Sequence, residues 1–189
     1  YTPMQEISFK YYKTMEHLKY EEAMGGDFQP IAPGDAWGKE WEYGWFTTSV
    51  HLGEWAKGKR VVMDLDLGGE STIFVNGKVF GTTRAAWSWY QNPLHYLCDN
   101  YLTKEGTGDD DIVLTMECYA GHSLPPESGE AASGPISEFF RWERPTAERA
   151  IVGRSTCGTW NEEAYHLMLE LEILLDIEKY ADGNSLRVT

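Results

Sequence analysis

The sequence predicts a mainly β protein, an antiparallel β-sandwich or jelly roll that ends in an α-helix. Three observations support this prediction. Apolar residues alternate with polar ones in several short segments, which is the period of a strand with one buried face. An Asn-Gly pair separates two apolar runs, and the last part of the chain changes to helical spacing. The 189 residues are enough for one domain that buries roughly 70% of its unfolded surface.

The strongest strand signals lie in residues 59–81, where three short apolar segments are separated by turns. The first segment has apolar residues at alternate positions, namely Val61, Met63, Leu65 and Leu67, and Gly68-Gly69 ends it. Later in this stretch, Asn76-Gly77 predicts a type I′ hairpin, because both central residues of that turn need a positive φ. A two-residue turn places Val75 opposite Lys78, Phe74 opposite Val79 and Ile73 opposite Phe80. Both faces of the hairpin then carry apolar residues, which predicts a position inside the sandwich.

Two longer strands flank this region. In the first, Phe46, Thr48, Val50 and Leu52 share one face, and His51 lies on the other face, where it is expected to be solvated. In the second, the inward face carries Ile112, Leu114, Met116 and Cys118. Cys118 is therefore predicted to be a small core residue.

The connections are less regular. Residues 1–24 fit strand and helix spacing only in part and receive no assignment, whereas the Gly/Pro-rich segment 25–40 is predicted to be an ordered loop. Trp37, Trp41 and Trp45 are four residues apart, but the surrounding glycines oppose a helix, so these side chains are predicted to plug the sandwich edge. Residues 82–105 form an aromatic-rich connection, and 121–136 an irregular, Pro-containing loop. One more short strand is expected around residues 139–142.

Residues 161–180 have the pattern of a helix. Asn161 is a candidate N-cap, Glu162 and Glu163 place acids in the first turn, and apolar residues follow at spacings of three and four. The apolar face is too wide for a helix that lies on one sheet, which points to a second surface. We therefore divide the chain into a β-sandwich domain with an N-terminal extension at 1–160 and a helix at 161–180 that leads to a further domain.

Charge and cysteine content narrow the classes of partner and compartment. Lys and Arg number 16 against 30 Asp and Glu, a net charge of −14, so neither nucleic acid nor an anionic membrane is an expected partner. No apolar stretch reaches membrane-helix length, and no signal-peptide pattern is visible. The three cysteines are widely spaced without a CxxC pair, and reduced thiols favour a cytoplasmic location.

Candidate chemical groups are few. The five histidines lack the spacing of a metal site, and the acids at 109–111 are expected to form a solvated turn rather than a calcium site. Among the aromatic residues, Trp87, Trp89 and Tyr90 are the best candidates for stacking on a sugar ring. The structural alternative is that these three residues close the sandwich or contact a neighbouring domain.

Several motifs, taken in order, resemble the N-terminal domain of glycoside hydrolase family 38 α-mannosidases of the cytosolic/vacuolar and bacterial type. They are GDAWG (34–38), WF (45–46), EWAKGKRVVMDLDLGGESTIFVNGKVFG (54–81), YAGH (119–122) and GRSTCGTWNEEAY (153–165). The resemblance implies a galactose-binding-like β-sandwich that precedes a catalytic α/β barrel. It also implies a parent enzyme, an α-mannosidase, of which this chain alone is a non-catalytic part.

The active site of that family is expected outside this chain. Family members hold zinc with Asp and His residues, including a His-x-Asp motif, whereas here His95 and His122 are followed two residues later by leucine. No catalytic residue and no metal ligand is assigned, and zinc is expected only in the catalytic domain. The expected partners are that domain, through packing that shapes substrate access, and mannose-containing glycans. The alternative function is a carbohydrate-binding module. Residues 81–87 also lack the Asp and His that relatives typically carry after the hairpin.

Overall fold

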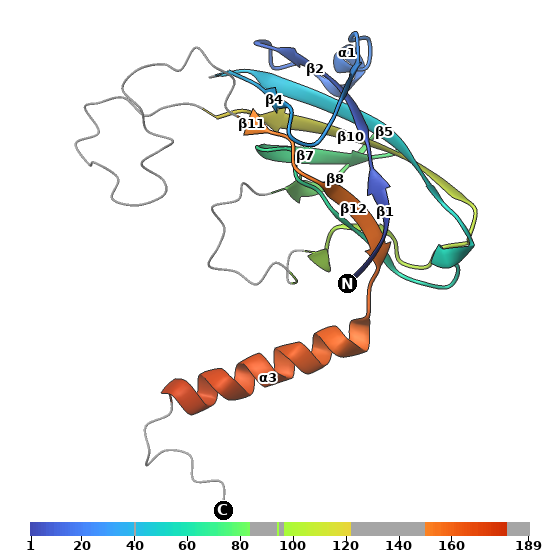
Figure 1. Cartoon of the computed structure of the whole chain (residues 1–189), viewed down its shortest axis with the longest axis vertical. Helices are drawn as coiled ribbons and strands as arrows, with labels where there is room; N and C mark the ends of the chain where they lie inside the picture. Colours follow the sequence, from blue (N-terminus) through green and yellow to red (C-terminus); the bar gives the residue numbers. More distant parts are fainter. Residues whose placement is uncertain (40, 84–93, 95–96, 122–149, 181–189) are drawn as a thin grey trace, which may run out of the picture.

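The computed structural model describes residues 1–39, 41–83, 94, 97–121 and 150–180, and these form two packed antiparallel sheets with a projecting helix (Figure 1). The strand order is β1-β12-β6-β9 in the four-stranded sheet and β3-β2-β5-β10-β7-β8 in the six-stranded sheet, and β11 pairs with β4. The predicted mainly β sandwich with a C-terminal helix is therefore confirmed. The loop expected at 121–136, apart from its first residue, and the strand expected around 139–142 lie outside the described residues.

The elements follow one another with short connections through most of the described chain. Their bounds are β1 (Thr2–Ile7), β2 (Phe9–Thr14), α1 (Tyr20–Ala23), β3 (Gln29–Ile31), β4 (Ala36–Trp37), β5 (Tyr43–Leu52), the 3₁₀ turn η1 (Glu54–Ala56), β6 (Val61–Asp64), β7 (Glu70–Val75), β8 (Lys78–Thr83), β9 (Tyr101–Thr103), β10 (Asp110–Tyr119), β11 (Ala150–Ile151), β12 (Ser155–Thr159) and α3 (Glu162–Tyr180).

The centre of the six-stranded sheet is the pair β5 and β10, which are joined from Leu52 opposite Asp110 to Tyr43 opposite Tyr119. The alternation read from the sequence is confirmed in both strands. Phe46, Val50 and Leu52 face the space between the sheets, and they meet the inward residues of β10. That inward set is Ile112, Leu114, Met116 and Cys118. A period of two therefore places one complete face of each strand in the core.

The β7–β8 hairpin forms as predicted at its turn but not along its whole length. Asn76 and Gly77 have φ of 49° and 76°, as a type I′ turn requires. However, Ile73 lies opposite Gly81 rather than Phe80, because the register shifts between Ile73 and Phe74. The extra residue is a β-bulge, and Phe80 packs instead against the ring of Tyr101, with centroids 5.0 Å apart.

The hairpin also lies at the edge of its sheet rather than inside the sandwich. β8 is the last strand of the six-stranded order, and Val79 is 71% exposed. The expectation of two covered faces is therefore wrong for β8. As the last strand of its sheet, β8 has a neighbouring strand on one side only. Its side chains therefore have fewer neighbours to pack against than those of β7, which has a strand on each side.

Three tryptophans predicted to plug the sandwich edge have three different environments. Trp37 is fully buried in the core, where Nε1 donates a 2.7 Å hydrogen bond to the Leu67 carbonyl. Trp45 is buried on the outer face of the six-stranded sheet, with Phe74 and Ala23 of α1. Trp41 is 47% exposed, so the prediction is wrong for this residue. Trp37 also belongs to β4, which makes segment 25–40 more regular than the expected loop.

The first fourteen residues contribute to both sheets. β1 pairs with β12 in the four-stranded sheet, and β2 pairs with β3 and β5 in the six-stranded sheet. α1 then crosses the outer face of the six-stranded sheet and covers Trp45. Residues that had no assignment from the sequence thus connect the two layers of the sandwich.

Candidate functional site

The candidate functional site is helix α3 together with its attachment to the four-stranded sheet. The helix leaves the sandwich and projects away from both sheets (Figure 1), and none of its residues from Glu162 to Tyr180 is buried. Its exposed apolar side chains form two stripes at intervals of four and three residues. The stripes consist of Leu167, Leu171, Leu174 and Leu175, and of Ile173, Ile177 and Tyr180. A helix that is apolar on more than one side is normally covered by protein, which agrees with the wide apolar face predicted from the sequence.

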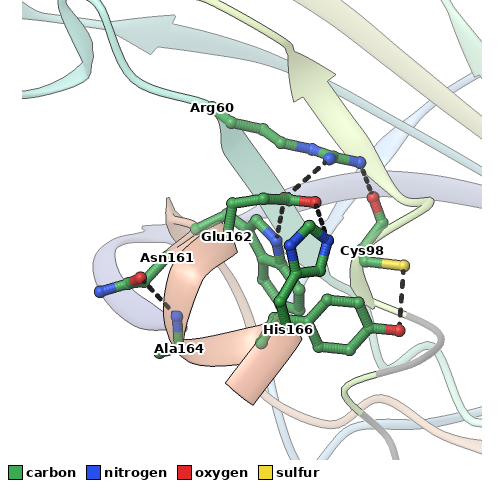
Figure 2. A network of polar contacts seen from close by, with 8 residues as sticks. Arg60, Cys98, Asn161, Glu162, Ala164 and His166 are labelled. Atoms are coloured by element: carbon green, nitrogen blue, oxygen red, sulfur yellow. Dashed lines mark hydrogen bonds and ion pairs between the residues drawn. The ribbon is translucent and has the colours of Figure 1, made fainter. Parts of the chain in front are cut away.

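The start of α3 is set by a cap. Oδ1 of Asn161 accepts a 2.9 Å hydrogen bond from the backbone N–H of Ala164, and this satisfies one of the donors that every helix leaves free at its N-terminus. The predicted N-cap and helix are therefore confirmed. Figure 2 shows Asn161 and Ala164 at the first turn, next to the polar network described below.

Glu162 is the centre of that network. One carboxylate oxygen, Oε2, accepts a 2.7 Å hydrogen bond from Trp160 Nε1 and lies 3.1 Å from Arg60 Nη1 (Figure 2). The other oxygen, Oε1, lies 3.3 Å from His166 Nε2, one turn along the helix. Three donors from two parts of the chain thus converge on one carboxylate, and a carboxylate in the first helical turn also interacts favourably with the helix dipole.

Arg60 joins this network to the sheet. Its second terminal nitrogen, Nη2, donates to the backbone carbonyl of Cys98, and its guanidinium lies 5.4 Å from the centre of the Tyr101 ring in β9. The backbone is joined as well, because the N–H of Trp160 donates to the Arg60 carbonyl at 3.0 Å. The polar contacts therefore tie α3 to the residue that precedes β6.

An apolar cluster supports these contacts on the outer face of the four-stranded sheet. Val62 of β6 is buried with Leu97 and Trp160. The Trp160 ring packs against Tyr165 of α3, with centroids 4.9 Å apart, and Cys98 Sγ lies 3.7 Å from the Tyr165 hydroxyl. The first turn of α3 is thus held by packing and by charge, whereas the later turns are exposed.

Cys118, Cys157 and His51, whose pKa values are raised, lie away from α3. Burial raises the pKa of Cys118 to about 12 and that of Cys157 to about 11, so both thiols are poor nucleophiles, and the core role predicted for Cys118 is confirmed. His51 is exposed as predicted, and its Nδ1 lies 2.9 Å from Asp111 Oδ1. In the part of the chain that the structure describes, no group of three or more His, Cys, Asp or Glu side chains is placed to hold a metal ion.

The stacking residues predicted from the sequence, Trp87, Trp89 and Tyr90, lie outside the described residues, so their role stays a prediction. Asn161 and Glu162 were predicted from the sequence as helix-start residues, whereas Arg60 was not recognised as the partner of Glu162. The only signal for it would have been the position of a single Arg directly before a buried strand.

Comparisons with known proteins show that the chain is similar to α-mannosidases. Residues 2–94 match the family model described as the jelly roll domain of α-mannosidase, and the two-sheet fold is that of a jelly roll domain. The chain is 27% identical to human α-mannosidase 2C1 over 171 residues, which is 88% of this chain and 14% of the relative. Mouse α-mannosidase 2C1 is 24% identical over 182 residues, 96% of this chain and 16% of the relative. The predicted resemblance to family 38 α-mannosidases is therefore confirmed.

The solved structures support the fold alone. A β-glucuronidase from Ruminococcus gnavus in complex with D-glucaro-d-lactam matches with a TM-score of 0.50 and 11% identity, over 85% of this chain and 30% of that chain. In the comparison with the mannosidases, the chain spans about one-seventh of the length of the human relative. Both of these mannosidases are mammalian, so the likeness to bacterial family members that the sequence indicated stays a prediction. Among the described helices, none has the length and apolarity needed to cross a membrane.

Proposed function

We propose that this chain is a non-catalytic N-terminal β-sandwich domain of an α-mannosidase-like glycoside hydrolase, and that it docks through α3 onto the remainder of a longer polypeptide. The observation that carries the proposal is the exposure of α3, which has no buried residue and whose apolar stripes are 44–73% exposed. The similarity to mannosidases about seven times longer supports a partner within the same polypeptide.

The energetics favour docking. Complete burial of one leucine or isoleucine side chain contributes about 1.5–3 kcal/mol, and α3 offers several that are half or more exposed, among them Leu167, Ile173 and Leu175. The anchored first turn adds to this, because a helix that is already held in one direction loses less conformational freedom on binding. Docking in this way would place the sandwich beside the catalytic region, where it would shape access of substrate.

The remaining expectations follow from the same proposal. The active-site zinc and the catalytic carboxylates belong to the catalytic region rather than to this chain, and mannose-containing glycans are the substrate class. A cytoplasmic location fits the three cysteines, Cys98, Cys118 and Cys157, which form no disulfide with one another. A carbohydrate-binding module remains the alternative function.

The first test concerns catalysis. The purified 189-residue chain should release no product from an aryl α-mannoside in the presence of zinc, whereas the longer product of the same gene should hydrolyse it. Reading the gene past Thr189 identifies that product. Turnover by the 189-residue chain that persists through rigorous purification would overturn the non-catalytic assignment.

The second test concerns docking. Replacing Leu171 and Leu174 by glutamate in the longer polypeptide should lower its thermal midpoint and its mannosidase activity, because two buried charges would lie at the docking surface. In the 189-residue chain, the same pair should change the free energy of unfolding by less than about 0.5 kcal/mol, because both side chains are exposed.

A matched control is available on the same helix. Lys179→Glu changes the net charge by the same amount as the two leucine substitutions together. It replaces no residue of either apolar stripe, and the Nζ of Lys179 lies 4.9 Å from the centre of the Tyr180 ring at the end of one stripe. It should leave the longer polypeptide close to wild type in both measurements. Equal behaviour of the leucine pair and this control would contradict docking through α3.

A further inference from the structure

A cavity of about 420 Å³ lies on the outer face of the six-stranded sheet. It is formed at one end of the sheet by outward-facing residues of β5, β10, β7 and β8, and the loop between β2 and α1 adds His17 to its wall. Its volume is within the range of small-ligand pockets. The six sheet residues that matter for its chemistry are Tyr43, Glu70, Thr72, Thr82, Glu117 and Tyr119.

The register of the sheet explains why these side chains meet. Glu117 of β10 lies opposite Thr72 of β7, and Tyr119 lies opposite Glu70 on one side and Tyr43 on the other. Because alternate residues face the same side of a sheet, all of these side chains lie on the surface away from the core. Four strands thus assemble one polar site from residues that are far apart in the sequence.

The lining has the chemistry of a site for hydrogen-bond donors. It contains two carboxylates, several hydroxyls and an imidazole, and its described residues include no Lys or Arg. Ionised carboxylates only accept hydrogen bonds, whereas sugar hydroxyls can both donate and accept. An anionic ligand would be repelled by Glu70 and Glu117, in a protein whose net charge is already −14.

Glu117 is a largely shielded carboxylate in the wall of the cavity. Its side chain is 15% exposed, and Nε2 of His17 lies 3.1 Å from Oε1 as an ion-pair partner. The same Oε1 is shielded from solvent without a hydrogen bond of good geometry among the described residues. Burial raises the pKa of this carboxyl group, and the nearby His17 lowers it. Glu117 therefore contributes a partly desolvated carboxylate to the cavity wall, with the His17 ring as its neighbour.

The aromatic side of the cavity is ordered before any ligand binds. The rings of Tyr43 and Tyr119 are 5.2 Å apart with a tilt of 33°, and His17 stacks on Tyr43 at 5.2 Å and 20°. Aromatic rings next to hydroxyl acceptors present an apolar surface and polar contacts to the same ligand. A sugar ring, with apolar C–H faces and hydroxyl edges, has the complementary arrangement.

We propose that this cavity binds an uncharged, hydroxyl-rich ligand, a single hexose unit, with Glu117 and Glu70 accepting hydrogen bonds from its hydroxyls. The proposed site is separate from α3, whose base lies on the outer face of the other sheet. Binding here therefore does not depend on the docking function, and one proposal can fail without the other.

The test is a chemical-shift titration of the isotope-labelled 189-residue chain with three probes. Methyl α-D-mannopyranoside and methyl β-D-glucopyranoside test two uncharged hexosides, and sodium glucuronate tests an anionic sugar. We expect saturable shifts at millimolar concentration for at least one hexoside at the amides of Thr72, Glu117 and Tyr119, and none there for glucuronate. Absence of saturation with both hexosides, shifts confined to other residues, or an equal response to glucuronate would overturn the proposal.

Variants locate the site within the cavity. Glu117→Gln should weaken hexoside binding about tenfold, because hydrogen bonds to a charged acceptor are stronger than those to a neutral one. Glu105→Gln, the same change at an exposed position outside the cavity, should have no effect. Thr72→Val provides a second variant that keeps the β-branched shape of the strand residue, and it should weaken binding severalfold.

The variants also decide between outcomes. Unchanged affinity in both Glu117→Gln and Thr72→Val, with thermal midpoints near wild type, would contradict the site even if hexoside binds. The pair Leu171→Glu and Leu174→Glu should retain wild-type sugar shifts. Loss of those shifts in that pair would show that the sugar response arises at α3.

Discussion

Arg60 and Glu162, 102 positions apart in the sequence, are joined by a 3.1 Å contact between Nη1 and Oε2. Arg60 immediately precedes β6, and Glu162 is the first residue of α3. The direction in which the helix leaves the sandwich is thus coupled to the start of β6, an inner strand of the four-stranded sheet. This coupling bears on the direction in which the apolar stripes of α3 point.

Glu162→Gln should loosen the first turn of α3 without unfolding the sandwich. The Arg60 and Glu162 side chains are 26% and 48% exposed, so solvent screening limits the loss to less than about 1 kcal/mol. We expect amide hydrogen exchange to accelerate in residues 164–167, because the carboxylate no longer joins Arg60 and Trp160 to the helix. Glu163→Gln is the matched control. Equal exchange in the two variants would contradict the anchoring role of Glu162.

Trp37 should be among the most sensitive core positions. Trp37→Ala should lower the free energy of unfolding by about 3–5 kcal/mol, since it leaves a large cavity. Trp37→Phe should cost about 1–3 kcal/mol, because the buried Leu67 carbonyl loses its indole donor. Trp41→Phe, at an exposed position, should change the free energy of unfolding by less than about 0.5 kcal/mol. Chemical denaturation measures all three, and similar values at Trp37 and Trp41 would refute the burial described for Trp37.

The three cysteines should differ in reactivity. Cys118 and Cys157 are buried, with pKa values raised to about 12 and about 11, and the thiolate is the reactive form. In native protein at neutral pH, Ellman's reagent should therefore modify no thiol other than the partly exposed Cys98. In denaturant, all three should react. Rapid modification of two or more thiols in the native state would contradict the core.

His51 should titrate above its ordinary pKa of 6.5, mainly because its ring nitrogen shares a hydrogen bond with Asp111. Proton NMR of the ring measures the midpoint, and Asp111→Asn should lower it. A raised pKa in the folded state means that the charged form is favoured by folding. This contribution is complete below pH 6.5 and disappears as the pH rises through the folded pKa. An unchanged midpoint in Asp111→Asn would contradict the assignment.

Local patterns were sufficient for the elements whose signals are contained in a few residues. Alternation predicted the buried faces of β5 and β10, the Asn76-Gly77 pair predicted the turn with two positive φ values, and Asn161 predicted the start of α3. In each case the physical cause acts within one turn or along one strand, so the sequence contains it directly.

Long-range pairing was beyond the reach of those patterns. The bulge that places Ile73 opposite Gly81 depends on how β8 meets its neighbours, and the edge position of β8 depends on the strand order. The cavity residues Glu70, Glu117 and Tyr119 come together only after the register of β7 and β10 is known. Arg60 likewise became recognisable as a partner of Glu162 only in three dimensions.

The strand order of the four-stranded sheet also has a consequence for biosynthesis. β12 lies between β1 and β6, so β1 lacks its neighbour among the described strands until residues Ser155–Thr159 leave the ribosome. Up to that point β1 and one edge of β6 expose unpaired backbone groups, which are prone to association with other chains. Closure of the sandwich therefore depends on β12, the last described strand before α3. In chain order, α3 thus follows a sandwich whose described strands have all been made.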